Sequence, residues 1–421
     1  MRCTNLLFGL LVSSLLLFTV HDADAAKRKV GRDSAVRSGP GAFNKKVGTV
    51  RTGMTVDELE AKGSWLKIKL PTVGASEGAY VGWLAAGVLQ GNDSGRTKRG
   101  LSGLRGAKPL VHVEKSVVVT ATKGAFGSKY AKKRGVDADA VALLDKVAFD
   151  SDDYSRFIGS LDEEDDRSEQ AIKYLGKLAE TGALDVNLEQ SIGRAVAARL
   201  VSQGVVKGGS LYEYVNLVAA RVGSFSPRDD LHYRVFILKS SAPAAFAAPG
   251  GFIFITKGLL AQMEDESELA GLLGHEIAHC VRLHGLSSFK RAVVQKRADD
   301  AFAMLDEAVV ETGGKVETIE DLENLADSYY EKVQKGSSRE HEKESDIFGA
   351  VFAYAAGYDS DGLARLFQRM HDAKHASYST KDEDKSHLPL DKRVKFLRGF
   401  TSQADMEDGD KKKGRFRSNA R

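Results

Sequence analysis

The sequence predicts an α+β fold in which a small all-β barrel precedes a mostly helical domain that contains a small β-sheet. Short runs of alternating polarity, separated by turn signals, fill residues 30–90 and predict the barrel. Several segments beyond residue 135 repeat apolar residues at helical spacing, which predicts the helical domain. The length of 421 residues suits one domain of about 200 to 250 residues beside the barrel.

Residues 1–25 have the features of a signal peptide. Arg2 supplies a positive start, Leu6 to Val20 form a short apolar region, and Ala23-Asp24-Ala25 offers a small-residue cleavage site. The apolar region is short for a membrane span, and an uncleaved anchor is the alternative. Because no later segment has about eighteen continuous apolar residues, we expect no integral membrane span in the mature chain.

Such a signal predicts export, either to a bacterial periplasm or out of the cell. Cleavage would remove Arg2, Asp22 and Asp24 and move the formal net charge from +3 to +4 (3 − 1 + 2). A charge so near neutral for this length argues against nucleic acid as a partner. Of the two cysteines only Cys280 would remain, so no intramolecular disulfide is expected.

The predicted barrel spans residues 28–90. Leu66, Ile68 and Leu70 alternate with polar residues as in a half-buried strand, and both tryptophans of the chain, Trp65 and Trp83, fall in this region. The runs Val36-Arg37-Ser38-Gly39-Pro40, Gly63 to Ile68 and Gly82-Trp83-Leu84 resemble the bacterial Src-homology-3-like domain. That resemblance implies a small barrel that often binds cell-wall or peptide ligands. The aromatic residues suit either a ligand groove or the barrel's own core.

The other boundaries follow from composition. Residues 91–135 are predicted to be a linker, and residues 136–405 the large domain. Residues 286–336 carry two helical patterns that suit either a hairpin over the cleft or a packing insertion. Residues 406–421 are rich in Lys and Arg and are predicted to be a disordered basic tail.

The pentapeptide His275-Glu276-Ile277-Ala278-His279 is the most informative motif in the large domain. It reads H-E-x-x-H, and its flanks predict a helix: Asp265 and Glu268 are predicted to form a capping pair, and Gly285 is the predicted stop. Two histidines four residues apart lie on one helix face and can bind one Zn²⁺. Glu276 then lies beside the open coordination position, where it can act as a general base. A buried helix with two hydrogen-bonded histidines is the alternative.

A catalytic zinc takes a third protein ligand, and the acidic stretch after Ser338 offers one. Glu342 and Asp346 are four residues apart and share a helix face. One carboxylate can bind the metal while the other orients a ligand histidine. Glu340 and Glu344 lie about 200° away from Glu342 around the helix and are therefore predicted to face solvent. An ordinary solvated charged face is the alternative for the whole stretch.

With these motifs the chain resembles the HtpX/BepA-type zinc metallopeptidases, which are related to the CAAX prenyl endopeptidases. The resemblance covers roughly residues 185 to 400 and rests on five segments that occur in the family's order: Ala245 to Gly251, Ser267 to His284, Ser338 to Asp346, Ala356-Gly357-Tyr358-Asp359, and Ser386 to Arg393. Three positions depart from the family's pattern: Ala245 replaces a frequent Asn, Ser345 replaces an Ala, and Leu388 stands between His387 and Pro389.

The resemblance implies a zincin-type (gluzincin) domain and a role for each matched residue. His275, His279 and Glu342 would bind one Zn²⁺ per chain, and Glu276 would be the general base. Asp346 would orient a ligand histidine, and His387 would polarise the scissile carbonyl. Independently of the resemblance, we expect the substrate to lie extended along the strand near Phe246 and Ala247, or along Phe252 to Thr256, by adding a strand to the sheet. A buried central strand is the alternative for Phe252 to Thr256.

The sequence therefore predicts an exported zinc metalloendopeptidase that acts on protein or peptide substrates of the envelope or the extracellular space. One alternative is a catalytically inert protein that binds cell wall or peptides through its barrel. A second is a zinc hydrolase of peptidoglycan peptides.

Overall fold

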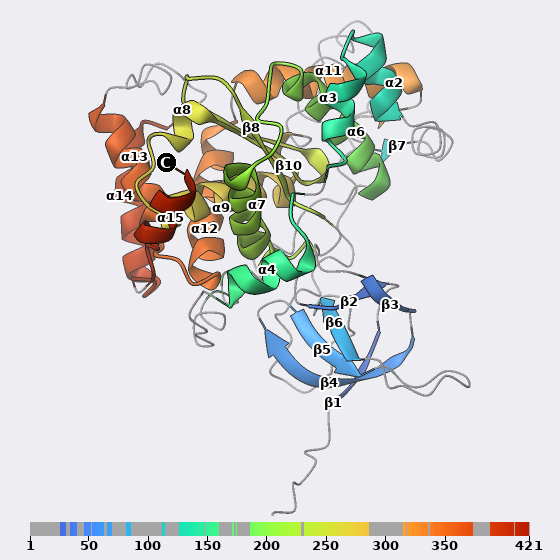
Figure 1. Ribbon diagram of the computed structural model, residues 1–421, viewed down its shortest axis with the longest axis vertical. Coiled ribbons are helices and arrows are strands. Elements are labelled where there is room, and N and C mark those ends of the chain that lie inside the picture. Colours follow the sequence, from blue (N-terminus) through green and yellow to red (C-terminus); the bar gives the residue numbers. More distant parts are fainter. Residues whose placement is uncertain are drawn as a thin grey trace, which may run out of the picture.

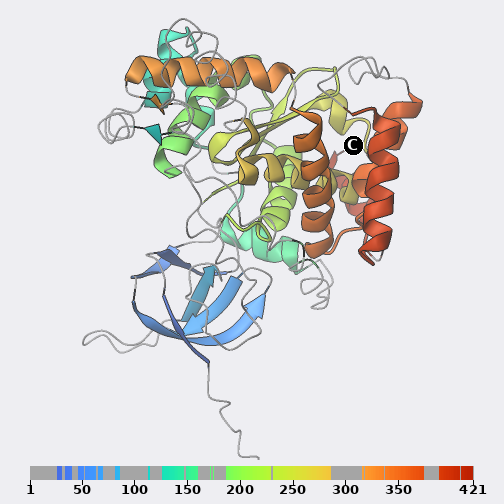
Figure 2. The same ribbon diagram turned by 180° about the vertical axis from the view of Figure 1, so that it is seen from behind.

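The computed structural model is an α+β protein, as predicted, with an N-terminal β-sheet domain and a larger, mainly helical domain (Figures 1 and 2). Apart from residues 52, 147, 229, 230, 317 and 408, the structure describes residues 26–30, 34–39, 46–62, 65–69, 81–85, 112–113, 126–159, 171, 174, 186–285, 315–335, 337–373 and 388–420. The predicted signal peptide, residues 1–25, lies outside this part of the chain. Among the described residues, no helix is both long and apolar enough to cross a bilayer.

The N-terminal sheet has six antiparallel strands in the order β1-β4-β5-β6-β2-β3. These are β1 (Ala26–Lys29), β2 (Ser34–Arg37), β3 (Lys46–Val50), β4 (Thr55–Lys62), β5 (Trp65–Lys69) and β6 (Val81–Ala85). In the part of the chain that is described, β1 and β3 do not pair, so the sheet is open there and not the closed barrel that we predicted. Valine, isoleucine and tryptophan side chains from its strands form a separate small core.

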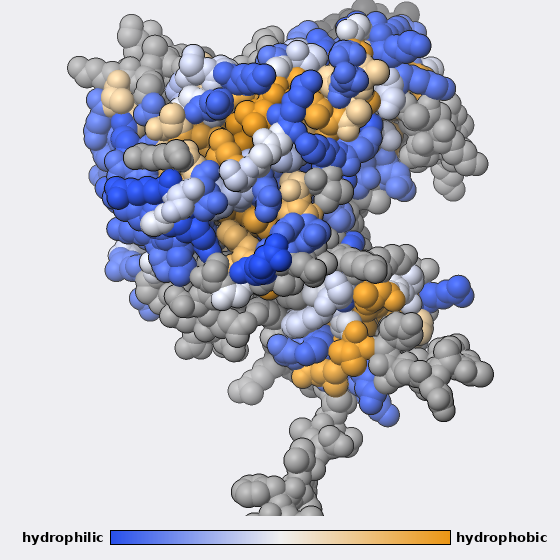
Figure 3. All heavy atoms as spheres, viewed as in Figure 1, coloured by the Kyte–Doolittle hydropathy of each residue, from blue (hydrophilic) through white to orange (hydrophobic). Residues whose placement is uncertain are grey.

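The two tryptophans are buried, which favours a packing role over a ligand groove. Trp65 is 3% exposed, and its indole N–H donates to the backbone oxygen of Ser224 in the large domain at 2.9 Å. Trp83 belongs to the core of the small sheet. Although the tryptophans are buried, Figure 3 shows apolar surface on the small domain. Among the described residues, the exposed large apolar side chains are Leu59 and Val81.

The large domain is built around a three-stranded sheet with the order β8-β10-β9. β8 (Arg234–Leu238) and β10 (Phe252–Thr256) are parallel, whereas β9 (Ala245–Ala248) is antiparallel to β10 and forms an edge. Alternate side chains of a strand point to opposite faces. Ile253 and Ile255 join one apolar cluster and Phe252 and Phe254 join another, so both faces of the sheet are buried under helices.

Residues of the following helices pack in the cluster that contains Phe252: α2 (Phe126–Lys133), α3 (Ala138–Leu143), α6 (Val186–Val201) and α11 (Ile319–Lys335). The cluster that contains Ile253 draws on α4 (Ser151–Ile158), α7 (Ser210–Gly223), α8 (Lys257–Leu260), α9 (Glu266–Arg282), α12 (Arg339–Ala355), α13 (Gly362–Asp372), α14 (Leu390–Gln403) and α15 (Lys413–Ala420). The 3-10 turn η4 (Pro249–Gly251) joins β9 to β10, and β7 (His112–Val113) pairs in parallel with β11 (Lys315–Val316). The observed α11 matches the second helical pattern expected in residues 286–336; the first lies outside the described residues.

Parts of the predicted linker and of the predicted disordered tail are helices of the large domain. The end of the expected linker 91–135 forms α2, whose Phe126 and Tyr130 are buried. Within the expected disordered tail, residues 413–420 form α15, whose Phe416 is fully buried. Arg415 of α15 donates to Glu266, which is also fully buried. A buried carboxylate is costly without a cationic partner, which explains why this basic segment is ordered.

Helices α9 and α12 pack directly against each other at a pair of glycines. A Cβ atom on Gly349 would lie 2.8 Å from the backbone nitrogen of His275, and one on Gly274 would lie 2.7 Å from the carbonyl oxygen of Gly349. Only a residue without Cβ permits such an approach. This contact brings α12 close to α9 at the level of His275.

Candidate metal centre

The helix that carries the H-E-x-x-H motif begins as its sequence predicts. Asp265 is the N-cap of α9, and its Oδ1 accepts a hydrogen bond from the backbone N–H of Glu268 at 3.1 Å. The helix ends at Arg282, because Leu283 adopts a left-handed conformation with φ 51°. This end comes three residues before Gly285, the stop that we predicted. Gly285 is required for a different reason: a Cβ atom there would overlap the ring of Tyr329.

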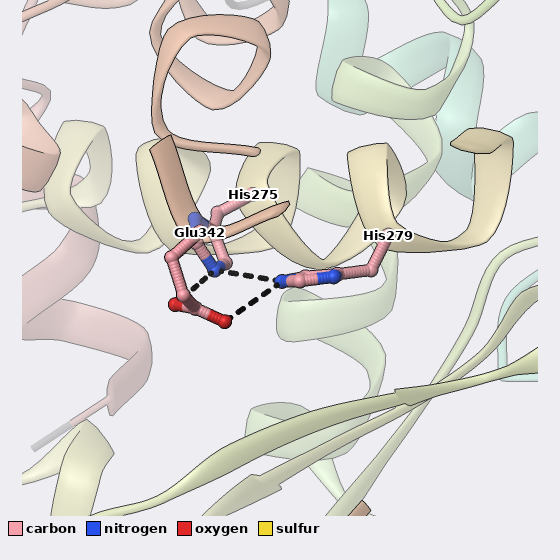
Figure 4. Close-up of side chains that lie close together, drawn as sticks. All are labelled: His275, His279 and Glu342. Carbon is pink, nitrogen blue, oxygen red and sulfur yellow. Dashed lines mark hydrogen bonds and ion pairs between the residues drawn. The ribbon is translucent and has the colours of Figure 1, made fainter. Parts of the chain in front are cut away.

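Three side chains converge between α9 and α12 (Figure 4). The Nε2 atoms of His275 and His279 are 3.1 Å apart. Glu342 places Oε2 3.6 Å from Nε2 of His275 and Oε1 3.5 Å from Nε2 of His279. His275 and Glu342 are buried. Because both histidines lie on α9 and Glu342 lies on α12, the packing of these two helices sets the distance between Glu342 and the two imidazoles.

The spacing of these donor atoms fits a tetrahedral zinc ion. Two ligands about 2.05 Å from zinc and at tetrahedral angles lie about 3.3 Å from each other. The three observed separations, 3.1, 3.5 and 3.6 Å, bracket that value. Two imidazoles and one carboxylate also form a donor set typical of catalytic zinc, which leaves one position for water. The arrangement is thus suited to hold one Zn²⁺.

Asp346 contacts the first histidine. Its Oδ1 lies 2.9 Å from Nδ1 of His275, on the side of the ring away from Nε2. Burial alone lowers the pKa of His275, but Asp346 and Glu342 outweigh it and raise that pKa to about 9. A carboxylate at Nδ1 favours the tautomer whose Nε2 is free to bind a metal.

Arg393 of α14 completes this side of the site. Its side chain is 3% exposed, and the guanidinium donates to both carboxylate oxygens of Asp346 at 2.9 and 2.6 Å and lies 3.2 Å from Glu342. Burial alone raises the pKa of Glu342, but Arg393 and the two histidines hold it well below its usual range. Arg393 was predicted only as part of a family motif. Its contacts with Glu342 and Asp346 could not be predicted, because no local pattern links it to those residues.

Glu276, the candidate base, is 5% exposed and lies between the two histidines along α9. Burial raises the pKa of Glu276, and the neighbouring His275 and His279 partly oppose that rise. A carboxylate with a raised pKa accepts a proton more readily near neutral pH.

On the side of His279 the structure corrects one expectation. We predicted that Glu344 faces solvent, but its Oε2 lies 2.8 Å from Nε2 of His284, and its Oε1 lies 2.8 Å from Arg282. His284 is 3% exposed, and its Nδ1 lies 2.9 Å from Nδ1 of His279. Burial is the main reason that the pKa of His284 is lowered to about 3. Helix periodicity could not reveal this contact, because the left-handed turn at Leu283 redirects the chain.

The two strands considered for substrate binding differ in their environment. β10 is the central strand and all five of its residues are buried, so the expectation that Phe252 to Thr256 receives an added strand is wrong. Phe246 and Ala247 lie on β9, the edge strand, and are partly exposed. The hydroxyl of Tyr329 lies 3.4 Å from the carbonyl oxygen of Ala247.

His387 lies outside the described residues, so its role stays a prediction. The chain is described again from Leu388, two residues before α14 begins.

Comparison with known proteins gives two domain matches. Residues 209–401 match peptidase family M48, and residues 33–90 match the bacterial SH3 domain. The first match contains all the side chains that converge at the candidate metal centre, and the second covers most of the N-terminal sheet.

Three similar proteins carry names that describe proteases. The chain is 25% identical over 194 residues to the mitochondrial metalloendopeptidase OMA1 of Schizosaccharomyces pombe, which is 46% of this chain and 54% of the relative. It is 26% identical over 171 residues to a putative beta-barrel assembly-enhancing protease of Vibrio cholerae; the aligned region covers 41% of this chain and 35% of the relative. It is 25% identical over 181 residues to the metalloprotease YcaL of Escherichia coli; that region covers 43% of this chain and 66% of the relative. The chain thus spans only part of the length of each relative.

Proposed function

We propose that this protein is an exported zinc-dependent endopeptidase, because residues 209–401 match peptidase family M48 and residues 33–90 match the bacterial SH3 domain. The observation that carries the proposal is the convergence of His275, His279 and Glu342 at separations that suit a tetrahedral zinc ion. The protease names of the three relatives support the same reaction class.

Zinc bound by these three residues would acidify a water molecule and polarise a peptide carbonyl. The side chains of the protein supply the other requirements of peptide hydrolysis. Glu276 accepts a proton from the attacking water on its carboxylate and then donates it to the leaving amine. Asp346 holds the ring of His275 in place, and Arg393 in turn holds Asp346. His387 is proposed to polarise the scissile carbonyl together with the metal.

The substrate is proposed to bind as an extended peptide along β9. A peptide can add to an edge strand as a further strand through backbone hydrogen bonds. The Tyr329 hydroxyl, 3.4 Å from the carbonyl oxygen of Ala247, would then give up that contact. Phe246 and Ala247 lie on that strand, and β9 packs against α9, which carries the two histidines. This geometry favours unfolded or loosely structured protein segments as substrates, because a folded strand is already paired.

The proposed location is the bacterial periplasm or the extracellular space, and the proposed substrates are proteins of those compartments. This rests on the signal-like residues 1–25 and on the two bacterial relatives. The SH3 domain is proposed to bind a cell-wall or peptide ligand through surface other than Trp65, whose indole contacts Ser224.

The experiment that tests the function compares wild type with Glu276→Gln for zinc content and for cleavage of an unfolded protein such as casein. We expect wild type to bind one zinc and cleave casein, with activity lost on chelation. The variant should keep its zinc and lose cleavage by a factor of about 10² to 10⁴, the range for a general base. Wild type that binds no zinc, or a variant that cleaves at the wild-type rate, would refute the proposal. Cleavage of purified wall sacculi but not casein would instead favour the peptidoglycan hydrolase.

A further inference from the structure

We propose that His284 and Glu344 form a positioning relay that fixes the ring orientation and tautomer of His279 for metal binding. The inference rests on the proposed metal site but adds two residues to it. Neither belongs to the His-His-Glu set, and both reach His279 from the side of the ring that faces away from Nε2.

The relay is continuous from α12 back to α9. Nδ1 of His284 lies 2.9 Å from Nδ1 of His279, and Nε2 of His284 lies 2.8 Å from Oε2 of Glu344. Arg282 binds the other oxygen of Glu344 at 2.8 Å. The His284 ring also stacks on His341, with 4.1 Å between centroids and 8° between planes. The ring of His284 is therefore held at both nitrogens and on one face.

Proton positions follow from these contacts and from the metal. To bind zinc through Nε2, a neutral His279 must carry its proton on Nδ1. That N–H then donates to Nδ1 of His284, which must be the unprotonated nitrogen of its ring. His284 consequently carries its own proton on Nε2 and donates it to the carboxylate of Glu344. A single assignment satisfies each of these contacts, and Ser345 Oγ is a more distant neighbour of His284 Nδ1, at 3.3 Å.

Carboxylates of α12 thus position both candidate metal-binding histidines, one by direct contact and the other through a third histidine. Asp346 of α12 contacts Nδ1 of His275 directly at 2.9 Å, whereas Glu344 reaches His279 only through His284. The left-handed backbone of Leu283 makes this possible, because it turns the chain after α9 so that His284 faces back toward His279. A bulky residue in this conformation is uncommon, and such strain often marks a functional position.

The test measures the affinity of the full-length protein for Zn²⁺ by competition with a chromogenic chelator. His284→Leu removes the acceptor and should weaken zinc binding about 10- to 100-fold, the usual effect of losing a partner of a metal-bound histidine. His284→Asn keeps an oxygen acceptor near the position of Nδ1 but loses the contact with Glu344, so its affinity should lie between those of His284→Leu and wild type, within about tenfold of wild type. Glu344→Ala should weaken binding, while Glu340→Ala, one turn away on an exposed position of α12, should not.

Spectra of the Co²⁺-substituted proteins give a second readout, because they report the coordination geometry and not the fold. We expect the visible bands of His284→Leu to shift and those of His284→Asn to resemble wild type. The relay is refuted if His284→Leu binds zinc as tightly as wild type, or if Leu and Asn variants lose affinity equally. Wild type that binds no zinc would refute the proposed function itself, so the two failures are distinguishable.

Discussion

At the scale of single residues, charge compensation decides how this site is built. Asp346 is fully buried and receives two hydrogen bonds from Arg393 as well as the contact with His275. A carboxylate placed so deeply is stable in its charged form only with such partners. The identity of the residue at 393 therefore matters for folding as well as for the metal site.

Replacing Arg393 by Met should lower the free energy of unfolding by about 3 to 5 kcal/mol, because it removes the guanidinium that donates to both oxygens of the buried Asp346. The matched control is Arg398→Met on the same helix. Arg398 pairs with Asp361, but their side chains are 47% and 33% exposed, so this change should cost less than about 1 kcal/mol. Urea denaturation of the two metal-free variants checks the difference. Equal losses would contradict the view that burial makes the Arg393 contact important.

At the scale of secondary-structure elements, the spacing between α9 and α12 determines whether Glu342 reaches the histidines. The glycine pair Gly274 and Gly349 sets that spacing, since each lies against the backbone of the opposite helix. The nearest atoms to each glycine belong to the backbone of the other helix, so a Cβ atom at either position would have to displace a helix.

Gly349→Ala should destabilise the protein and weaken zinc binding, because its Cβ would come within 2.8 Å of the His275 backbone nitrogen. Gly399→Ala in α14 is the control: among the described residues, no atom beyond its chain neighbours and its own helix backbone lies within 4 Å of the added Cβ. There the higher helix propensity of alanine should stabilise the protein by up to about 1 kcal/mol. Thermal unfolding and zinc titration of both variants provide the measurements. A Gly349→Ala protein with unchanged zinc affinity would disprove the close-contact argument.

At the scale of the whole molecule, the small sheet and the large domain influence each other electrostatically. Burial lowers the pKa of His232 in the large domain to about 4, and Arg37 of β2 and Arg234 of β8 contribute to that shift. The unfolded value is about 6.5. Between pH 6.5 and pH 4 the unfolded chain therefore binds more protons than the folded one, and acid destabilises the fold.

We predict that the contribution of His232 to the free energy of unfolding is constant above pH 6.5 and is lost as the pH falls toward 4. The limiting slope of the free energy of unfolding in this window is about 1.4 kcal/mol per pH unit. His232→Gln should flatten the pH dependence of the free energy of unfolding across this window. Urea denaturation of wild type and variant at several pH values gives the comparison. Parallel curves for the two proteins would show that His232 is not responsible.

The sequence alone determined the α+β class, the capped helix around His275 and His279, and the choice of Glu342 as their partner. These depend on local periodicity and on the few side chains that bind zinc, both of which are readable along a chain. It did not determine that α2 and α15 are ordered, since their stability comes from Phe126, Phe416 and Glu266, which are buried by distant parts of the chain.

Tertiary structure alone decided how the metal site is supported. Arg393 reaches Asp346 across 47 positions of sequence and Glu344 reaches His284 across 60, and no local pattern encodes such contacts. The left-handed turn at Leu283 also breaks the periodicity from which a sequence argument proceeds. Ligands can be predicted from residue type and spacing, whereas their supporting partners depend on which surfaces the packed helices bring together.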